Sequence, residues 1–320
     1  MHQYRAFGMT IESELALALP PSPTVSHSQG PLPSPHRHVP APHGASSSCA
    51  VFPEWRVSIG LGSVKHDSGL QQALGRIHYG KSGEDIQVEV PWAGRYRVRG
   101  DSRIVVEPEP GVDERTVGLY ITGLVLSFLL RRRPFITLHG SAVTGPHGAI
   151  AFLGSRGSGK STTAAALTKS GYEILCDDVI PVASGSVVFP GIPFPKLLSD
   201  AYGSLVGDPT LASHLFDGVD KYQVELAASH EPAPLRSIYI LVPADVPGLG
   251  IVPLSGGAKV AALFSHVASS PGIDDSRKVF SRSIERLGAI PAFLVSRPIA
   301  GYSLPELIGE IVREDKGQNP

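Results

Sequence analysis

The sequence has few cysteines, and its positive and negative charges almost cancel. Only two cysteines occur among the 320 residues, Cys49 and Cys176, and they lie far apart and outside any C-x-x-C spacing. This excludes a disulfide framework and a cysteine zinc site, and a reducing cytoplasm is the expected location. The formal charge of -1 at pH 7 shows no excess of lysine and arginine, so nucleic acid is not an expected partner.

Long hydrophobic runs are also missing. The longest, "VGLYITGLVLSFLL" at 117–130, is too short to span a bilayer, and it predicts a buried helix that ends at the cations of 131–133. The N-terminus lacks a basic start followed by an unbroken apolar core, so we expect no secretory signal. No membrane contact is predicted.

Proline, serine, glycine and histidine dominate the segment from Pro20 to Ser48. Such a composition has almost nothing to bury and predicts a mobile insertion. The segment contains four histidines, at His27, His36, His38 and His43. Without fixed geometry they do not predict a metal site.

The remaining pattern predicts two domains. Short alternating runs separated by glycine follow Cys49, so residues 1–115 are expected to form a smaller β-rich domain that includes the Pro-rich insertion. Residues 116–320 alternate apolar strands with helical patterns and predict an α/β domain. The later helices of this domain are expected near 257–269, 274–287 and 304–314.

A glycine-rich loop carries the strongest signal. "GSRGSGKS" matches G-x-x-x-x-G-K-[ST] and lies between the apolar strand "AIAFLG" and a helical segment, which is the context that a phosphate-binding P-loop requires. Glycines let successive N–H groups converge on phosphate oxygens, and the helix N-terminus adds its positive end. The predicted nucleotide-binding residues are Gly154, Ser155, Arg156, Gly157, Ser158, Gly159, Lys160, Ser161 and Thr162.

Two adjacent carboxylates, Asp177 and Asp178, end the next apolar strand. In a parallel α/β sheet the carboxyl end of this neighbouring strand lies beside the phosphate loop. One carboxylate can serve Mg²⁺ together with the hydroxyl of Ser161, and the other is free to accept a proton. The aspartate that does not serve the metal has an alternative role, which is to cap the following turn.

His139 is predicted to end the strand that precedes the one feeding the loop. A single histidine in a strand is usually structural, but this position makes His139 a candidate for the active site.

These motifs resemble a known family. "LHGSAV", "GSRGSGKSTTAAAL" and "CDDVIPV", in this order, resemble the C-terminal catalytic domain of HPr kinase/phosphorylase, whose fold is related to that of phosphoenolpyruvate carboxykinase. "YRAFGMTIESEL" and "PGIPFPKLL" resemble the HPr-kinase-like branch found with lasso-peptide biosynthesis genes, which phosphorylates a serine of the precursor peptide. The resemblance covers most of 120–310. The Glu-containing, glycine-rich signature of HPr kinase/phosphorylase is missing after the aspartates, which argues against phosphorolysis and against HPr as the substrate.

The resemblance implies roles for matching residues. His139 would lie near the transferred phosphate, Asp177 would be the catalytic base, and Asp178 would serve Mg²⁺. Lys196 and Lys221 are candidate cations for the transferring phosphoryl group, with a surface position as the alternative for each. The family also implies a homo-oligomer.

The first hypothesis is therefore an ATP-dependent serine kinase that uses ATP and Mg²⁺ and acts on a peptide or protein, with a lasso precursor as the substrate that the resemblance implies. The alternative is a P-loop NTPase or nucleotide-binding regulatory module, which would need only the loop and one aspartate. A small-molecule kinase would differ only in its acceptor.

Overall fold

The computed structural model divides the chain into two compact units. It describes residues 1–20, 38–39, 50–51, 55–70, 72–215, 220–299 and 303–317. Apart from Pro20 and the backbone of β3 (His38–Val39), the predicted Pro-rich insertion lies outside the described residues. β3 pairs with β4 (Ala50–Val51), which follows the insertion. The first unit comprises Met1–Phe135 and Ser269–Val279, and the second comprises Ile136–Ala268 and Phe280–Pro320.

The first unit contains a mostly antiparallel sheet of eight strands, in the order β1-β2-β5-β10-β9-β8-β7-β6. Alternating side chains of β2, β5 and β9 are buried, as Tyr96 and Val98 are on β9, so one face of the sheet forms a core. The strands are β1 (His2–Ala6), β2 (Met9–Ser13), β5 (Trp55–Leu61), β6 (Gln72–Leu74), β7 (Ile77–Ser82), β8 (Asp85–Val90), β9 (Gly94–Arg99) and β10 (Arg103–Pro108).

The long apolar run forms the predicted buried helix, in three consecutive helical segments. The first segment, α1 (Glu114–Tyr120), is capped by Asp113, whose side chain accepts from the N–H of Thr116. The last segment is α2 (Leu126–Arg132). A π-helical turn, η1 (Ile121–Val125), joins them. The predicted domain boundary at 115 falls at the start of this helix. All three helical segments belong to the first unit, which includes residues up to Phe135. Across the described ranges, none of the helices combines the length and the apolar character needed to cross a membrane.

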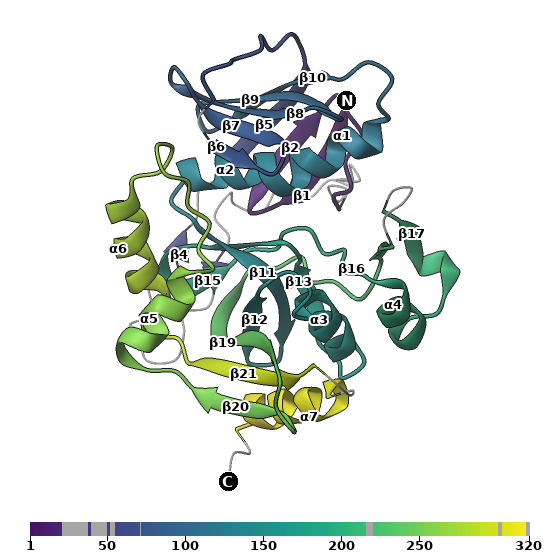
Figure 1. Ribbon diagram of the computed structural model, residues 1–320, viewed down its shortest axis with the longest axis vertical. Helices are drawn as coiled ribbons and strands as arrows, with labels where there is room; N and C mark the ends of the chain where they lie inside the picture. Colours follow the sequence, from purple (N-terminus) through teal and green to yellow (C-terminus); the bar gives the residue numbers. More distant parts are fainter. Residues whose placement is uncertain are drawn as a thin grey trace, which may run out of the picture. The chain divides into compact units, whose positions relative to one another are not determined.

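The second unit is mixed α/β and contains a second eight-stranded sheet (Figure 1). β12 pairs with β11 on one side and with β19 on the other, and β19 pairs with β21. The strands are β11 (Ile136–Gly145), β12 (Gly148–Gly154), β13 (Glu173–Cys176), β14 (Val179–Val182), β15 (Val187–Val188), β19 (Ala233–Ala244), β20 (Gly250–Pro253) and β21 (Ala292–Pro298). A separate small sheet consists of β16 (Lys196–Leu197), β17 (Ala212–His214) and β18 (Tyr222–Val224), and α4 (Ser199–Leu205) follows β16.

Helices cover both faces of this sheet. Along β12, Ile150 and Phe152 pack in one core with α3 (Lys160–Thr168) and α7 (Leu304–Asp315). Ala149, Ala151 and Leu153 point the opposite way, into a core shared with α5 (Gly256–Phe264) and the end of α6 (Ser276–Leu287). The three later helices are therefore confirmed, with slightly different ends. Because β12 is covered on both faces, it is apolar and buried along its whole length, up to the glycine loop.

Two strand predictions are wrong in detail. β11 does not end at His139 but continues to Gly145, because "GSAVTG" pairs with β12 in a hairpin. β13 is also not the direct parallel neighbour of β12. Instead β11 lies between them and is antiparallel to both. The loop after β12 and the turn after β13 nevertheless lie at the same end of the sheet.

Gly140 lies where β11 passes from β14 to β12. A Cβ at this position would lie inside van der Waals contact with the carbonyl oxygen of Phe152, and that backbone is held in the hairpin. We expect Gly140→Ala to lower the free energy of unfolding by about 1–3 kcal/mol. Gly203→Ala on α4 is the control, since a Cβ there meets nothing within 4 Å, and it should leave stability unchanged or raise it by up to about 1 kcal/mol. Urea denaturation measures both, and equal effects would contradict the packing.

Candidate active site

The glycine loop joins β12 to α3 in a conformation that requires glycine. Gly154, Gly157 and Gly159 have φ values of 140°, 83° and 94°, and such positive values strain other residues. At Gly154 a Cβ would also collide with the carbonyl oxygen of Leu241. The Ser158 N–H donates to Ser155 O at 3.2 Å, which closes the turn. This arrangement leaves the main chain open to an anion at the start of a helix.

The side chain of Lys160 lies within the loop that precedes it. Its Nζ donates to the carbonyl oxygens of Gly154 at 3.0 Å and Ser155 at 2.9 Å. Burial lowers the pKa of this ammonium, while the two nearby aspartates act in the opposite direction. A cation and the positive end of α3 therefore lie together at the loop, as an anion site requires.

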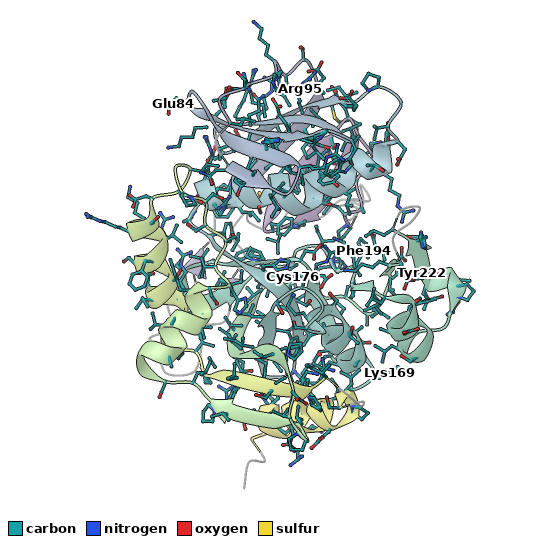
Figure 2. The ribbon with its side chains drawn as sticks, viewed as in Figure 1. Glu84, Arg95, Lys169, Cys176, Phe194 and Tyr222 are labelled. Carbon is teal, nitrogen blue, oxygen red and sulfur yellow. The ribbon has the colours of Figure 1, made fainter. Side chains whose placement is uncertain are left out.

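The acid pair lies in a tight turn between β13 and β14. The Val179 N–H donates to Asp177 O at 2.9 Å, and Asp178 has a φ of 66°. A positive φ is uncommon for aspartate and concentrates at functional sites. Cys176, labelled in Figure 2, ends β13 just before the pair; its thiol is buried, which raises its pKa and makes it unreactive.

Asp177 links the acid pair directly to the glycine loop. Its side chain is buried, and Oδ1 accepts hydrogen bonds from Ser161 Oγ at 2.9 Å and from Ser141 Oγ at 2.5 Å. The Lys196 N–H donates to Oδ2 at 3.3 Å. Burial, followed by the negative charge of Asp178, raises the pKa of Asp177 to about 6.

Asp178 lies in a different environment. Its carboxylate forms an ion pair with Lys196 Nζ and is 36% exposed. Burial favours the neutral acid, but the charge of Lys196 outweighs it and lowers the pKa of Asp178. Lys221 adds positive charge nearby. The two carboxyl groups therefore have pKa values shifted in opposite directions.

His139 completes the cluster. Its Nδ1 lies 3.0 Å from the carbonyl oxygen of Asp178, which can only accept, so Nδ1 carries the proton and Nε2 is available as an acceptor. Removal of the ring from solvent, followed by the charge of Lys160, lowers the pKa of His139. This shift favours the neutral imidazole.

The predicted metal ligands are chemically suited to Mg²⁺. The Ser161 hydroxyl and the two carboxylates offer oxygen ligands within one small region. Within the described ranges no three His, Cys, Asp or Glu side chains form a metal-binding group. Mg²⁺ commonly uses one or two carboxylates together with substrate phosphates rather than a full protein cage.

Most predicted residues lie together. Asp177, Asp178, His139, Lys160 and Lys196 are connected by the contacts above. Arg156 is exposed on the loop, and Thr162 lies on the first turn of α3.

Three residues of the site were not found from the sequence. Ser141 is within the "LHGSAV" motif, but only the pairing of β11 beside β13 brings it to Asp177. The carbonyl oxygen of His266 accepts from the His139 N–H at 3.1 Å. Arg297 Nη1 donates to Ser158 O at 3.0 Å. The last two are over 100 residues from their partners, so no local pattern could reveal them.

Comparison with known proteins gives only a weak likeness of fold to solved structures. No family model and no curated protein matches the sequence. Among solved structures, the chain is similar to the Hpr(Ser) kinase/phosphatase from Coxiella burnetii. The identity is 17%, the match covers 57% of this chain and 97% of that chain, and the TM-score is 0.29. A likeness this low supports no function, so the function must come from the site itself.

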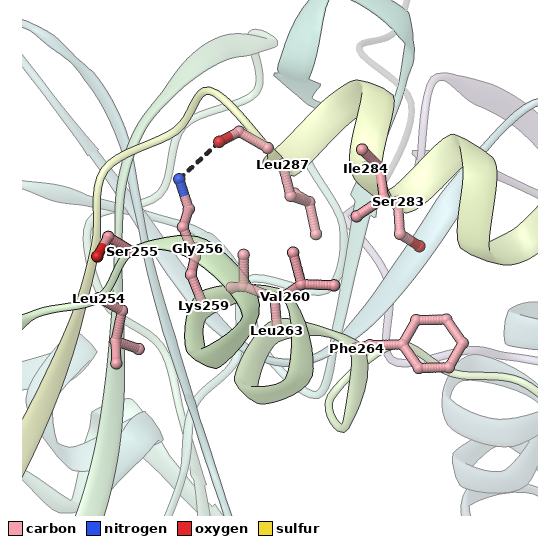
Figure 3. A pocket seen from close by; sticks show the side chains of 11 residues that line it. Leu254, Ser255, Gly256, Lys259, Val260, Leu263, Phe264, Ser283, Ile284 and Leu287 are labelled. Atoms are coloured by element: carbon pink, nitrogen blue, oxygen red, sulfur yellow. Dashed lines mark hydrogen bonds between the residues drawn. The ribbon is translucent and has the colours of Figure 1, made fainter.

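A cavity of about 420 Å³ lies elsewhere in the second unit, between α5 and α6 (Figure 3). Its walls are mainly apolar, with Val260, Leu263 and Leu287 facing it. At its rim Lys259 Nζ donates to Gly288 O at 2.7 Å, which Figure 3 marks with a dashed line. No predicted site residue lines this cavity.

The buried hydroxyl of Ser141 should support Asp177. Ser141→Ala removes a hydrogen bond to a buried carboxylate, so we expect the free energy of unfolding at pH 7 to fall by about 1–3 kcal/mol. Ser265→Ala is the control, because the Ser265 hydroxyl is exposed and bonds only to Ala262 O on its own helix; its effect should stay within about 0.5 kcal/mol. Thermal and urea unfolding compare the two, and a neutral Ser141→Ala would argue against the bond.

Proposed function

We propose that this chain is an ATP-dependent kinase that transfers the γ-phosphate to a serine hydroxyl of a peptide or protein. The observation that carries the proposal is the 2.9 Å hydrogen bond between Ser161 and Asp177. It joins the residue that a P-loop uses at the phosphates to a carboxylate pair that simple nucleotide binding does not need.

The glycine loop would hold the triphosphate. The main-chain N–H groups of the loop and the positive end of α3 suit the oxygens of the triphosphate. The ammonium of Lys160 already lies within the loop. Mg²⁺, held by Ser161 and Asp178, would neutralise charge on the phosphates when bound. Lys196 would steady Asp178 and add positive charge where the phosphoryl group transfers.

Asp177 is proposed as the base. A group that accepts a proton near neutral pH works best with a pKa close to that pH, and two carboxyls with pKa values pushed apart commonly divide into base and charge partner. The serine oxygen would attack the γ-phosphorus, the bond to the β–γ bridging oxygen would break, and the serine proton would pass to Asp177 Oδ. ADP and phosphoserine would leave. His139 Nε2 is free to accept a hydrogen bond from the acceptor or the phosphate.

The acceptor is proposed from the sequence motifs. They favour a lasso precursor peptide, and the same resemblance is the basis for proposing a homo-oligomer. A P-loop NTPase or regulatory module is the second candidate, and it leaves the second carboxylate and His139 without a use.

Incubation with ATP radiolabelled at the γ-phosphate separates the kinase from the NTPase. Label on serine of a peptide supports the kinase, and release of free phosphate alone contradicts it.

Variants of the acid pair test the division of roles. We expect Asp177→Asn to lower kcat by about two decades or more while leaving the Kd for Mg·ATP nearly unchanged, because it removes proton acceptance but not the phosphate site. Asp178→Asn should instead weaken the dependence of ATP binding on magnesium.

Isothermal titration at several magnesium concentrations, together with single-turnover kinetics, measures both effects. Asp220→Asn is the control, since Asp220 lies outside the cluster and contacts Ser199. If Asp177→Asn abolished magnesium-dependent binding, Asp177 would be the metal partner and not the base.

A further inference from the structure

Arg297 reaches the glycine loop from a distant part of the chain. It lies near the end of β21, which is parallel to β19, which in turn is parallel to β12 (Figure 1). This order brings the carboxyl end of β21 to the edge of the sheet where β12 runs into the loop. There Nη1 of Arg297 donates to the carbonyl oxygen of Ser158 at 3.0 Å.

The guanidinium also packs closely against the next residue of the loop. A Cβ placed on Gly159 would collide with Arg297 Nη1. The φ of 94° at Gly159 favours glycine, and the Arg297 guanidinium occupies the space where a Cβ would lie. Arg297 is in this sense part of the wall of the loop.

The contact fixes the direction of one amide. The peptide group between Ser158 and Gly159 is planar and trans, so its C=O and N–H point in opposite directions. Arg297 holds the C=O from outside the loop. The N–H of Gly159 lies in the same plane, antiparallel to that C=O, and therefore points away from the guanidinium.

We infer that Arg297 is a positioning residue for the nucleotide phosphates: by holding the Ser158 carbonyl oxygen, it aims the Gly159 N–H at the anion. The inference rests on the proposed function in one respect, that phosphates bind at this loop. Arg297 does not touch the reacting atoms. A planar guanidinium suits this role, because its N–H groups have a fixed direction.

Binding measurements on Arg297 variants test the inference. The probes are Mg·ATP and magnesium pyrophosphate, titrated by calorimetry at a temperature well below the unfolding midpoint of every variant. We expect Arg297→Ala to raise the Kd of both probes about tenfold, which corresponds to about 1.4 kcal/mol. Arg297→Lys keeps the charge but loses the fixed fork, so it should recover only part of the affinity.

Arg286→Ala is the matched control. Arg286 is a buried arginine of the second unit, and its Nη1, like that of the half-buried Arg297, donates to a main-chain carbonyl oxygen, that of Val182, at 3.0 Å. It does not contact the loop. We expect this variant to lower the unfolding temperature without changing either Kd.

The outcomes separate the two proposals. Wild type that binds both probes, with Arg297→Ala binding equally well, overturns the role of Arg297 and leaves the kinase proposal standing. An equal loss of affinity in Arg286→Ala also overturns it, because the effect would then reflect stability alone. Wild type that binds neither probe overturns both proposals.

Discussion

One strand, β11, determines where the parts of the site meet. Its second half pairs with β12, which leads into the glycine loop, and its opposite edge pairs with β13 and β14, which flank the acid pair. The strand itself carries His139 and Ser141. Backbone hydrogen bonds therefore bring a loop, a turn and two side chains to one end of a sheet, and helices on both faces hold the strands in place. This pairing brings Ser161 and Asp177 within hydrogen-bond distance.

The electrostatics of the site follow from that geometry. The pKa of a buried carboxyl beside a charged one is raised, whereas the pKa of a carboxyl paired with an ammonium is lowered. Asp177 and Asp178 are adjacent in sequence, yet the tight turn directs them to these two different surroundings. Lys160 contributes to the same pattern, because its charge favours the neutral form of His139. The cluster therefore contains a carboxyl with a raised pKa, a carboxylate paired with a lysine, and further cations within a small region.

Local features of this protein could be predicted from sequence, and long-range pairing could not. The P-loop string, the apolar strand before it and the helix after it are encoded within about twenty residues, so the phosphate loop was recognisable. The acid pair was found because it ends an apolar run. The position of β11 between β12 and β13 depends on its hairpin with β12, and the turn of that hairpin has no distinctive sequence. The sequence instead suggests that β12 and β13 are direct parallel neighbours. Arg297 reaches the loop only because β21 lies two strands from β12, and strand order leaves no local trace.

The central claim is that main-chain amides of the glycine loop bind the phosphates of ATP. Amide NMR spectra recorded during titration with Mg·ATP test it most directly, since an N–H that begins to donate to a phosphate oxygen changes its chemical shift. The account predicts saturable changes that are largest at Gly157, Gly159, Lys160 and Ser161, and their loss in Lys160→Ala. Saturable changes confined to other parts of the chain, or none at all, would contradict it.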